Sequence, residues 1–222
     1  MAERSIRIAM NGVTGRMGRN QHLERSIMAI RRQGGVELPN GDRVVPEPVL
    51  VGRNPEKLEA LAAEFGVDEW TTDLDGVLAD PDIDVYFDAQ LTSLRAAAVR
   101  AAIDAGKAVY CEKPLAEDSA TARDLARRAQ EAAIAHGIVQ DKLFLPGLLS
   151  LRRLIDSGFF GRILAVKGDF GYWVFEGDVE SPQRPAWNYK REEGGGIILD
   201  MFPHWQYVIE GLFGRIRSVV AL

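Results

Sequence analysis

The fold of this chain is decided by the stretch Ile6-Arg7-Ile8-Ala9-Met10-Asn11-Gly12-Val13-Thr14-Gly15-Arg16-Met17-Gly18. Its first five residues form a short apolar run that predicts a strand, and a segment with helical spacing follows the glycines through about Ile30. Strand, glycine turn and helix in this order favour dinucleotide binding, because glycines let the helix N-terminus approach a pyrophosphate closely. The spacing is G-x-x-G-x-x-G rather than G-x-G-x-x-G, so a tight turn without a ligand is the alternative.

Strands and helices continue to alternate beyond this turn. Core strands are predicted at residues 49–51, 70–72, 84–89, 109–111 and 138–140, with helices at residues 56–65, 73–79, 94–105 and 119–135. We expect Ser93 to cap the helix at 94–105 and Gly137 to end the helix at 119–135. Six repeats of strand and helix predict an α/β fold with a doubly wound parallel sheet.

One segment interrupts the alternation. Two β-prone pieces flank Asn40-Gly41, which predicts a small hairpin inserted before the second core strand. Pro46-Glu47-Pro48 is expected to close this hairpin, so that the core strand begins afresh at Val49.

The apolar run Val109-Tyr110-Cys111 ends abruptly in Glu112-Lys113-Pro114. Proline cannot donate to a strand ladder, so the strand must stop and leave Lys113 at its carboxyl end. Open α/β sheets bind their ligands at this end of their strands. A surface lysine before a turn is the alternative.

A single arginine bears on the choice of cofactor. An acidic residue usually follows the second strand in an NAD site, whereas an arginine there accommodates the 2′-phosphate of NADP. Arg53 stands at that position, so we expect NADP, with NAD as the alternative. A solvated arginine, or one that stacks on adenine with either cofactor, also fits the position.

The pattern changes after Phe144. A helix is predicted at residues 148–157, ended by Gly158, and residues 163–174 alternate with aromatic side chains like an antiparallel strand with one covered face. We therefore divide the chain into a first domain at residues 1–145 and the start of an α+β domain at residues 146–222.

A second group of candidate residues follows Gly194-Gly195-Gly196. If the next segment is helical, Asp200 and His204 are four residues apart and share a face, so the carboxylate can orient the imidazole for acid/base work. Pro203 removes the amide bond to Leu199, which predicts a helix that starts late or bends. An amphipathic helix with a capping aspartate and an incidental histidine is the alternative.

Composition excludes several classes of protein. The 222 residues carry a formal net charge of -5, which argues against a nucleic-acid binder and a polybasic membrane anchor. No apolar run is long enough to span a bilayer. The one cysteine, Cys111, permits no internal disulfide, so we expect a cytoplasmic protein in which Cys111 is an inert core thiol. No metal site is predicted.

Together these motifs resemble the Gfo/Idh/MocA family, which includes glucose-fructose oxidoreductase and inositol dehydrogenase. The matching residues are the glycine turn at 12–18, Glu112-Lys113-Pro114, the segment from Leu145-Pro146 to Gly158-Phe159-Phe160-Gly161, and Gly194-Gly195-Gly196 with Asp200 and His204. The resemblance implies a Rossmann domain, then a domain with an open antiparallel sheet through which subunits pair. It also implies an NAD(P)-dependent oxidoreductase acting on sugars or cyclitols.

The resemblance also implies a role for each site residue. Lys113 would lie between nicotinamide and substrate and hydrogen-bond the reacting oxygen. His204 would be the general acid/base, and Asp200 would be its orienting partner. The residues expected to bind the cofactor are Gly12, Val13, Thr14, Gly15, Arg16, Met17, Gly18, Arg53, Leu91, Thr92, Glu112 and Lys113.

The chain departs from the family pattern in three places. Arg95 stands near the position where members usually have a histidine after the fourth strand, and the hairpin lengthens the first repeat. Members also continue well beyond residue 222, so we expect the second sheet to be incomplete. Two other interpretations are a dihydrodipicolinate reductase, whose histidine-rich motif is missing here, and a regulatory protein that senses NADP without turnover.

Overall fold

The computed structural model describes residues 2–170 and 196–221. The chain divides into two compact units, Met1–Val139 and Gln140–Leu222. Each unit is described by itself.

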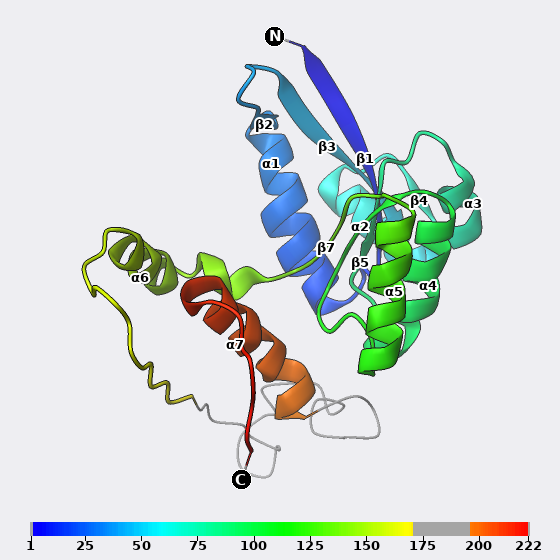
Figure 1. Cartoon of the computed structure of the whole chain (residues 1–222). Helices are drawn as coiled ribbons and strands as arrows, with labels where there is room; N and C mark the ends of the chain where they lie inside the picture. The colour runs from blue at the N-terminus through cyan, green and yellow to red at the C-terminus, as the bar shows by residue number, and fades with distance from the viewer. Residues whose placement is uncertain (1, 171–195, 222) are drawn as a thin grey trace, which may run out of the picture. The chain divides into compact units, whose positions relative to one another are not determined.

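The described residues of the first unit form a seven-stranded sheet (Figure 1). Its strands are β1 (Glu3–Asn11), β2 (Val36–Glu37), β3 (Arg43–Val51), β4 (Trp70–Thr71), β5 (Val85–Asp88), β6 (Ala108–Cys111) and β7 (His136–Ile138). The order is β2-β3-β1-β5-β6-β7, with β4 also on β3, and all pairs except β2 with β3 are parallel. The parallel strands thus have the 3-2-1-4-5-6 order of dinucleotide-binding folds, with the switch point between β1 and β5. The predicted doubly wound sheet is confirmed.

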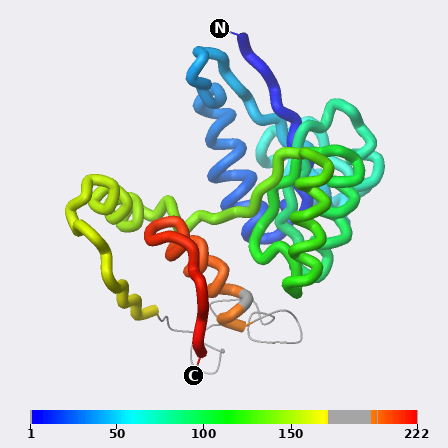
Figure 2. Tube along the Cα trace, in the orientation of Figure 1, coloured from blue at the N-terminus to red at the C-terminus, as the bar shows by residue number. Residues whose placement is uncertain are grey.

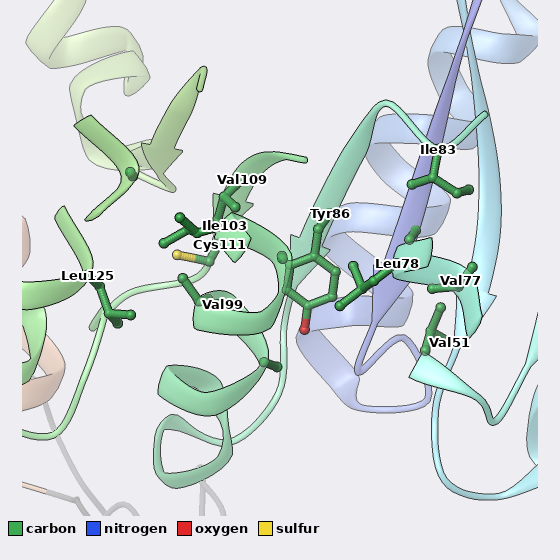
Figure 3. Packing of buried hydrophobic residues seen from close by; sticks show 14 of the residues in the cluster. Val51, Val77, Leu78, Ile83, Tyr86, Val99, Ile103, Val109, Cys111 and Leu125 are labelled. Carbon is green, nitrogen blue, oxygen red and sulfur yellow. The ribbon is translucent and has the colours of Figure 1, made fainter. Parts of the chain in front are cut away.

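Helices cover both faces of this sheet. They are η1 (Met17–Ile27, a π-helix), α1 (Met28–Arg32), α2 (Pro55–Phe65), α3 (Leu74–Ala79), α4 (Thr92–Asp104) and α5 (Ser119–Glu131). Successive strand residues point to opposite faces, so Met10 packs with η1 and α2 while Ala9 packs with α3, α4 and α5. Figure 3 shows the hydrophobic cluster on the face that carries Ala9, where Tyr86 and Cys111 lie among helix residues such as Leu78 and Val99.

The predicted hairpin is confirmed, because β2 pairs antiparallel with the start of β3. The predicted break at Pro46-Glu47-Pro48 is wrong, because β3 runs through both prolines as one strand. The Leu50 amide donates to the Glu69 carbonyl, away from β1. Alternate residues face the same edge, so the nitrogens of Pro46 and Pro48 also face away from β1. There β2 and β4 pair only with the two ends of β3, so the prolines cost no ladder hydrogen bond.

Two helix ends differ from their predictions. Helix α4 begins at Thr92 with Leu91 at the N-cap position, and no side chain in the described ranges caps it, so Ser93 is not its cap. Helix α5 ends at Glu131, and Gly137 lies inside β7 rather than at the helix end. A Cβ at Gly137 would stand 3.2 Å from the Tyr110 ring, so packing between β6 and β7 explains this glycine.

The described residues of the second unit form helices and extended chain. The helices are η2 (Asp141–Phe144, a 3₁₀ turn), α6 (Pro146–Asp156) and α7 (Ile197–Phe213), and α7 runs through Pro203 without starting late. The strand predicted from residue 163 differs: residues 163–170, in the yellow segment of Figure 2, form neither strand nor helix and have no strand partner among the described residues. The rest of that prediction, at residues 171–174, lies outside them.

None of the helices in the described ranges is both long and apolar enough to cross a membrane.

Candidate functional site

The glycine turn follows β1 directly. Gly12 has a φ of +86°, and a Cβ there would stand 2.6 Å from the Ala89 carbonyl carbon and 2.7 Å from the Gln90 nitrogen. A Cβ at Gly18 would stand 2.8 Å from the Val13 Cα. Only glycine therefore fits at positions 12 and 18. Gly12 lets the turn pack against the β5–α4 loop, and Gly18 lets the helix begin close to the turn.

The outer side of the turn has more room. A Cβ at Gly15 would meet only the Gly12 carbonyl oxygen, at 3.3 Å, among the described atoms. Thr14, Arg16 and Met17 beside it are exposed, whereas Val13 is fully buried. Gly15 is uncrowded on the outer side of the turn, whereas Gly12 and Gly18 pack tightly on its inner side. Such a glycine at the start of a helix leaves room for a phosphate group.

The parallel strands bring the other expected cofactor residues to the same edge of the sheet. Arg53 lies two residues after β3 and is exposed, next to Asn54, whose side chain caps α2 by accepting the Lys57 amide at 2.8 Å. Leu91, 52% exposed, and Thr92 lie in the loop after β5 and at the start of α4. Carboxyl ends of parallel strands meet at one edge, so this set is gathered by topology rather than by sequence proximity.

Lys113 follows the end of β6 and is half-buried. The Glu112 amide donates to the Asp88 carbonyl at 2.8 Å, which keeps the chain in register with β5 to its last residue. The Lys113–Pro114 peptide is cis. Because β6 pairs with β5, Lys113 lies one strand away from the switch point between β1 and β5.

A histidine and a glutamate join the helix after the glycine turn to this lysine. His22 Nε2 lies 2.6 Å from Glu112 Oε1, and both side chains are largely buried. Glu112 Oε2 accepts the Lys113 amide at 3.1 Å. Burial alone would raise the pKa of Glu112, but the hydrogen bond and charge of His22, with the amide and charge of Lys113, outweigh burial and lower it. The sequence analysis missed His22, because a residue 90 positions away carries no pattern that pairs it with Glu112.

We expect Glu112→Gln to lower the free energy of unfolding by about 2 kcal/mol at neutral pH, the usual value for a hydrogen bond to a charged group. Because the pKa of Glu112 is lowered on folding, its stabilising effect is present above 4.5, its ordinary value, and is lost as the pH falls through the lowered pKa. Urea unfolding from pH 7 to pH 3 should therefore show the two curves converging below pH 4.5. The exposed Glu117→Gln is the control, and a difference that persists unchanged at pH 3 would contradict the assignment.

The second unit holds the other expected site residues. His204 is 5% exposed on α7, one turn after Asp200, which is half-buried. The His204 Nδ1 lies 2.5 Å from the Tyr207 hydroxyl and 3.7 Å from Asp141 Oδ1. Tyr207 and Asp141 are partners that the sequence analysis missed. Tyr207 is three residues beyond His204 and could have been found from helical spacing, but nothing in the sequence marks Asp141.

The Tyr207 hydroxyl links His204 to the η2 turn. The Lys142 amide donates to the Tyr207 oxygen at 3.3 Å, and the Tyr207 hydroxyl donates to Asp141 at 3.4 Å. The Tyr207 hydroxyl, 2.5 Å from His204 Nδ1, is a donor to that nitrogen in one tautomer of the ring and an acceptor from it in the other. Burial would raise the pKa of Asp141, but Lys142 and the His204 charge lower it overall, so Asp141 is the anionic end of this chain of hydrogen bonds.

The three expected catalytic residues are divided between the units: Lys113 lies in the first, and Asp200 and His204 lie in the second. Cys111 is 1% exposed, and burial raises its pKa to about 12, so it is the inert core thiol expected. The described residues contain no group of three or more histidine, cysteine or acidic side chains placed to hold a metal.

The strand order and the glycine turn after β1 define a dinucleotide-binding protein of the Rossmann type. Residues 6–137 match the family model for the oxidoreductase family with an NAD-binding Rossmann fold, and residues 148–222 match the GFO/IDH/MocA C-terminal domain. The chain therefore belongs to the Gfo/Idh/MocA family of oxidoreductases, as the sequence motifs predicted.

Several relatives carry activities in their names. D-xylose dehydrogenase of Paenarthrobacter nicotinovorans is 56% identical over 97% of this chain and 56% of its own length. Levoglucosan dehydrogenase of Pseudarthrobacter phenanthrenivorans is 29% identical over 78% of this chain and 44% of its own length. A structure of levoglucosan dehydrogenase with NADH and levoglucosan has a TM-score of 0.77 at 25% identity, over 95% of this chain and 55% of that one. The chain thus spans about half the length of the curated relatives it matches.

Proposed function

We propose that the protein is an NAD(P)-dependent dehydrogenase that transfers a hydride between nicotinamide and a CH–OH group of a sugar, cyclitol or related polyol. The observation that carries this proposal is the position of Lys113, held by buried groups at the end of β6, on the same edge of the sheet as the glycine turn. The names of the relatives support it, since they act on D-xylose, levoglucosan and scyllo-inositol.

The nicotinamide, when bound, supplies the acceptor or donor of the hydride. In the proposal, Lys113 hydrogen-bonds the substrate oxygen, and its ammonium stabilises the negative charge that develops there as the hydroxyl loses its proton. His204 takes that proton as general base, and returns it as general acid in the reverse direction. Because Nδ1 is hydrogen-bonded to Tyr207, the proposal gives the proton exchange with substrate to Nε2.

Asp200 is assigned the orienting role for His204 that the family resemblance implies. The cofactor-binding set comprises the glycine turn at 12–18, Arg53, Leu91, Thr92, Glu112 and Lys113. We assign residues 1–145 to the NAD(P)-binding domain and residues 146–222 to the start of the substrate domain. We also propose a cytoplasmic enzyme that forms a homo-oligomer through the open sheet of that second domain.

Tyr207→Phe tests the contact between Tyr207 and His204. Loss of the hydroxyl removes the hydrogen-bond partner that orients the His204 ring at Nδ1, so we expect kcat to fall about tenfold, the effect of one hydrogen bond of about 1.4 kcal/mol. Steady-state kinetics measure this. An unchanged kcat in a folded Tyr207→Phe variant would contradict this arrangement.

Arg53 supports a preference for NADP over NAD. Its exposed guanidinium follows β3, beside the capped N-terminus of α2, and an arginine at this point pairs with a 2′-phosphate. We expect Arg53→Ala to raise the Kd for NADPH about tenfold or more while that for NADH changes less than about twofold. Titration of both reduced dinucleotides by fluorescence measures this. Equal losses for both would mean that Arg53 stacks on adenine instead.

Absorbance at 340 nm tests the proposed function. The full chain is incubated with NAD or NADP and a panel of pentoses, hexoses, anhydrosugars and cyclitols, with D-xylose first because of the relative that is 56% identical. We expect reduced nicotinamide to form with at least one member of the panel. Tight dinucleotide binding with no turnover across the panel would instead favour a cofactor-sensing regulator.

A further inference from the structure

A buried arginine lies between the β5–α4 loop, which contains Gln90, and the turn after β6 that carries Lys113. Arg95, on α4, has a side chain that is 2% exposed. Its Nε donates to Asp88 Oδ1 at 3.0 Å, one terminal nitrogen donates to the Gln90 carbonyl at 2.7 Å, and the other donates to the Pro114 carbonyl. One guanidinium thus joins the end of β5, the β5–α4 loop and the turn after β6.

The aspartate that receives this arginine is itself fully enclosed. Asp88 is 0% exposed, and beyond Arg95 its oxygens accept the Tyr86 hydroxyl at 2.7 Å and the Gln90 side chain at 2.8 Å. Asn11, the last residue before Gly12, donates its side-chain amide to the Tyr86 oxygen at 3.0 Å. These hydrogen bonds therefore connect the carboxyl ends of β1, β5 and β6, from Asn11 before the glycine turn to Pro114.

The backbone of Lys113 is held on both sides. Its amide donates to Glu112, and the carbonyl of the next residue accepts from Arg95. A long flexible side chain reaches a fixed point only as well as its backbone is placed, and small displacements of a reacting group lower the rate steeply. The guanidinium serves all three acceptors because its five donors form a rigid planar fork, which a lysine ammonium does not reproduce.

The geometry points to Arg95 as a positioning residue that acts through Pro114 to place Lys113, with Asp88 and the Gln90 carbonyl as its anchors. This inference rests on the proposed function of Lys113. The simpler role, a buried ion pair that only stabilises the fold, makes a different prediction, because a fold-stabilising pair does not depend on which side chain stands at position 113.

A double-mutant cycle in the full chain separates the two roles. Wild type, Arg95→Lys, Lys113→Ala and the double variant are assayed well below the lowest melting temperature. We expect Arg95→Lys to lower kcat between about tenfold and a hundredfold, with the Kd for NAD(P)H within about twofold of wild type. In the Lys113→Ala background the same change should cost less than about twofold, because its effect passes through the missing lysine.

Two further variants keep the test decisive. Arg100→Lys is the control. Arg100 lies on the same helix, its side chain is 41% exposed, and it pairs with Asp124 at 3.6 Å. We therefore expect Arg100→Lys to leave kcat unchanged both in the wild-type and in the Lys113→Ala background. If Arg95→Lys does not fold, the charge-free pair Asp88→Asn with Arg95→Gln takes its place, since it leaves no lone buried charge.

The outcomes are distinguishable. A loss in kcat that is equal in the two backgrounds, or full kcat in a folded Arg95 variant, overturns the positioning role while Lys113 keeps its own. A wild-type chain that turns over no sugar overturns the proposed function and this inference with it.

Discussion

Lys113→Ala is expected to leave the protein folded and able to bind dinucleotide while kcat falls by about 10²-fold or more. An ammonium beside the substrate oxygen stabilises charge that exists only in the transition state, so its removal lowers turnover rather than ground-state binding. The half-buried Lys113 is held through its backbone by Glu112, and alanine keeps that hydrogen bond. Steady-state kinetics, NAD(P)H fluorescence titration and thermal unfolding of the same preparation measure the three quantities.

Lys57→Ala is the matched control for this variant, because Lys57 is exposed on α2 and should tolerate alanine without change. Lys113→Arg is informative as well. It keeps the charge but not the shape, so partial recovery is expected. Full turnover by Lys113→Ala would remove Lys113 from the chemistry.

Gly12→Ala is expected to prevent measurable dinucleotide binding and to lower the melting temperature. A left-handed φ of +86° costs a non-glycine residue about 1–2 kcal/mol. A larger penalty comes from the Cβ, which would stand 2.6 Å from the backbone of Ala89. That backbone cannot yield cheaply, because the Ala89 amide is bonded to the Asn11 carbonyl at 2.8 Å. The turn must therefore move away from β5, which displaces the helix N-terminus.

Gly66→Ala provides the control for backbone strain alone. Gly66 has a φ of +64° at the end of α2, and a Cβ there would meet no described atom within 4 Å. We expect it to cost a similar strain in thermal unfolding and to leave the Kd for NAD(P)H within about twofold. The two variants together separate strain from the clash, and wild-type binding by Gly12→Ala would show that the turn does not carry the cofactor.

The order of strands and helices in the first unit was predictable, because periodicity and turn residues act locally. Asn54, Asp73 and Asp118 each cap the helix that follows them. The errors arose where tertiary contacts decide. Pro46 and Pro48 are tolerated because, among the described residues, no strand pairs with the edge of β3 that they face between β2 and β4. No local pattern shows which edge of a strand is paired.

The positions of the candidate site residues in the fold were predictable where a residue ends a strand or begins a helix, while their roles stay a prediction. The glycine turn and Lys113 satisfy that condition. His22, Arg95 and Asp141 do not, since each acts on a residue that only the fold brings near: Glu112, Pro114 and His204 respectively. For Arg95 the sequence holds one weak signal, which is an arginine on a predicted helix that is otherwise rich in alanine. If such a helix buries the charge, the charge requires a partner.

Transfer of deuterium from sugar to cofactor tests the central claim most directly. The full chain is incubated with oxidised dinucleotide and D-xylose deuterated at every carbon, and the reduced nicotinamide is examined by mass spectrometry. Hydride transfer from a sugar carbon predicts one deuterium in each reduced nicotinamide formed. If the dinucleotide binds but takes up no deuterium from this sugar, or from equally labelled hexoses and cyclitols, the protein is not the dehydrogenase proposed.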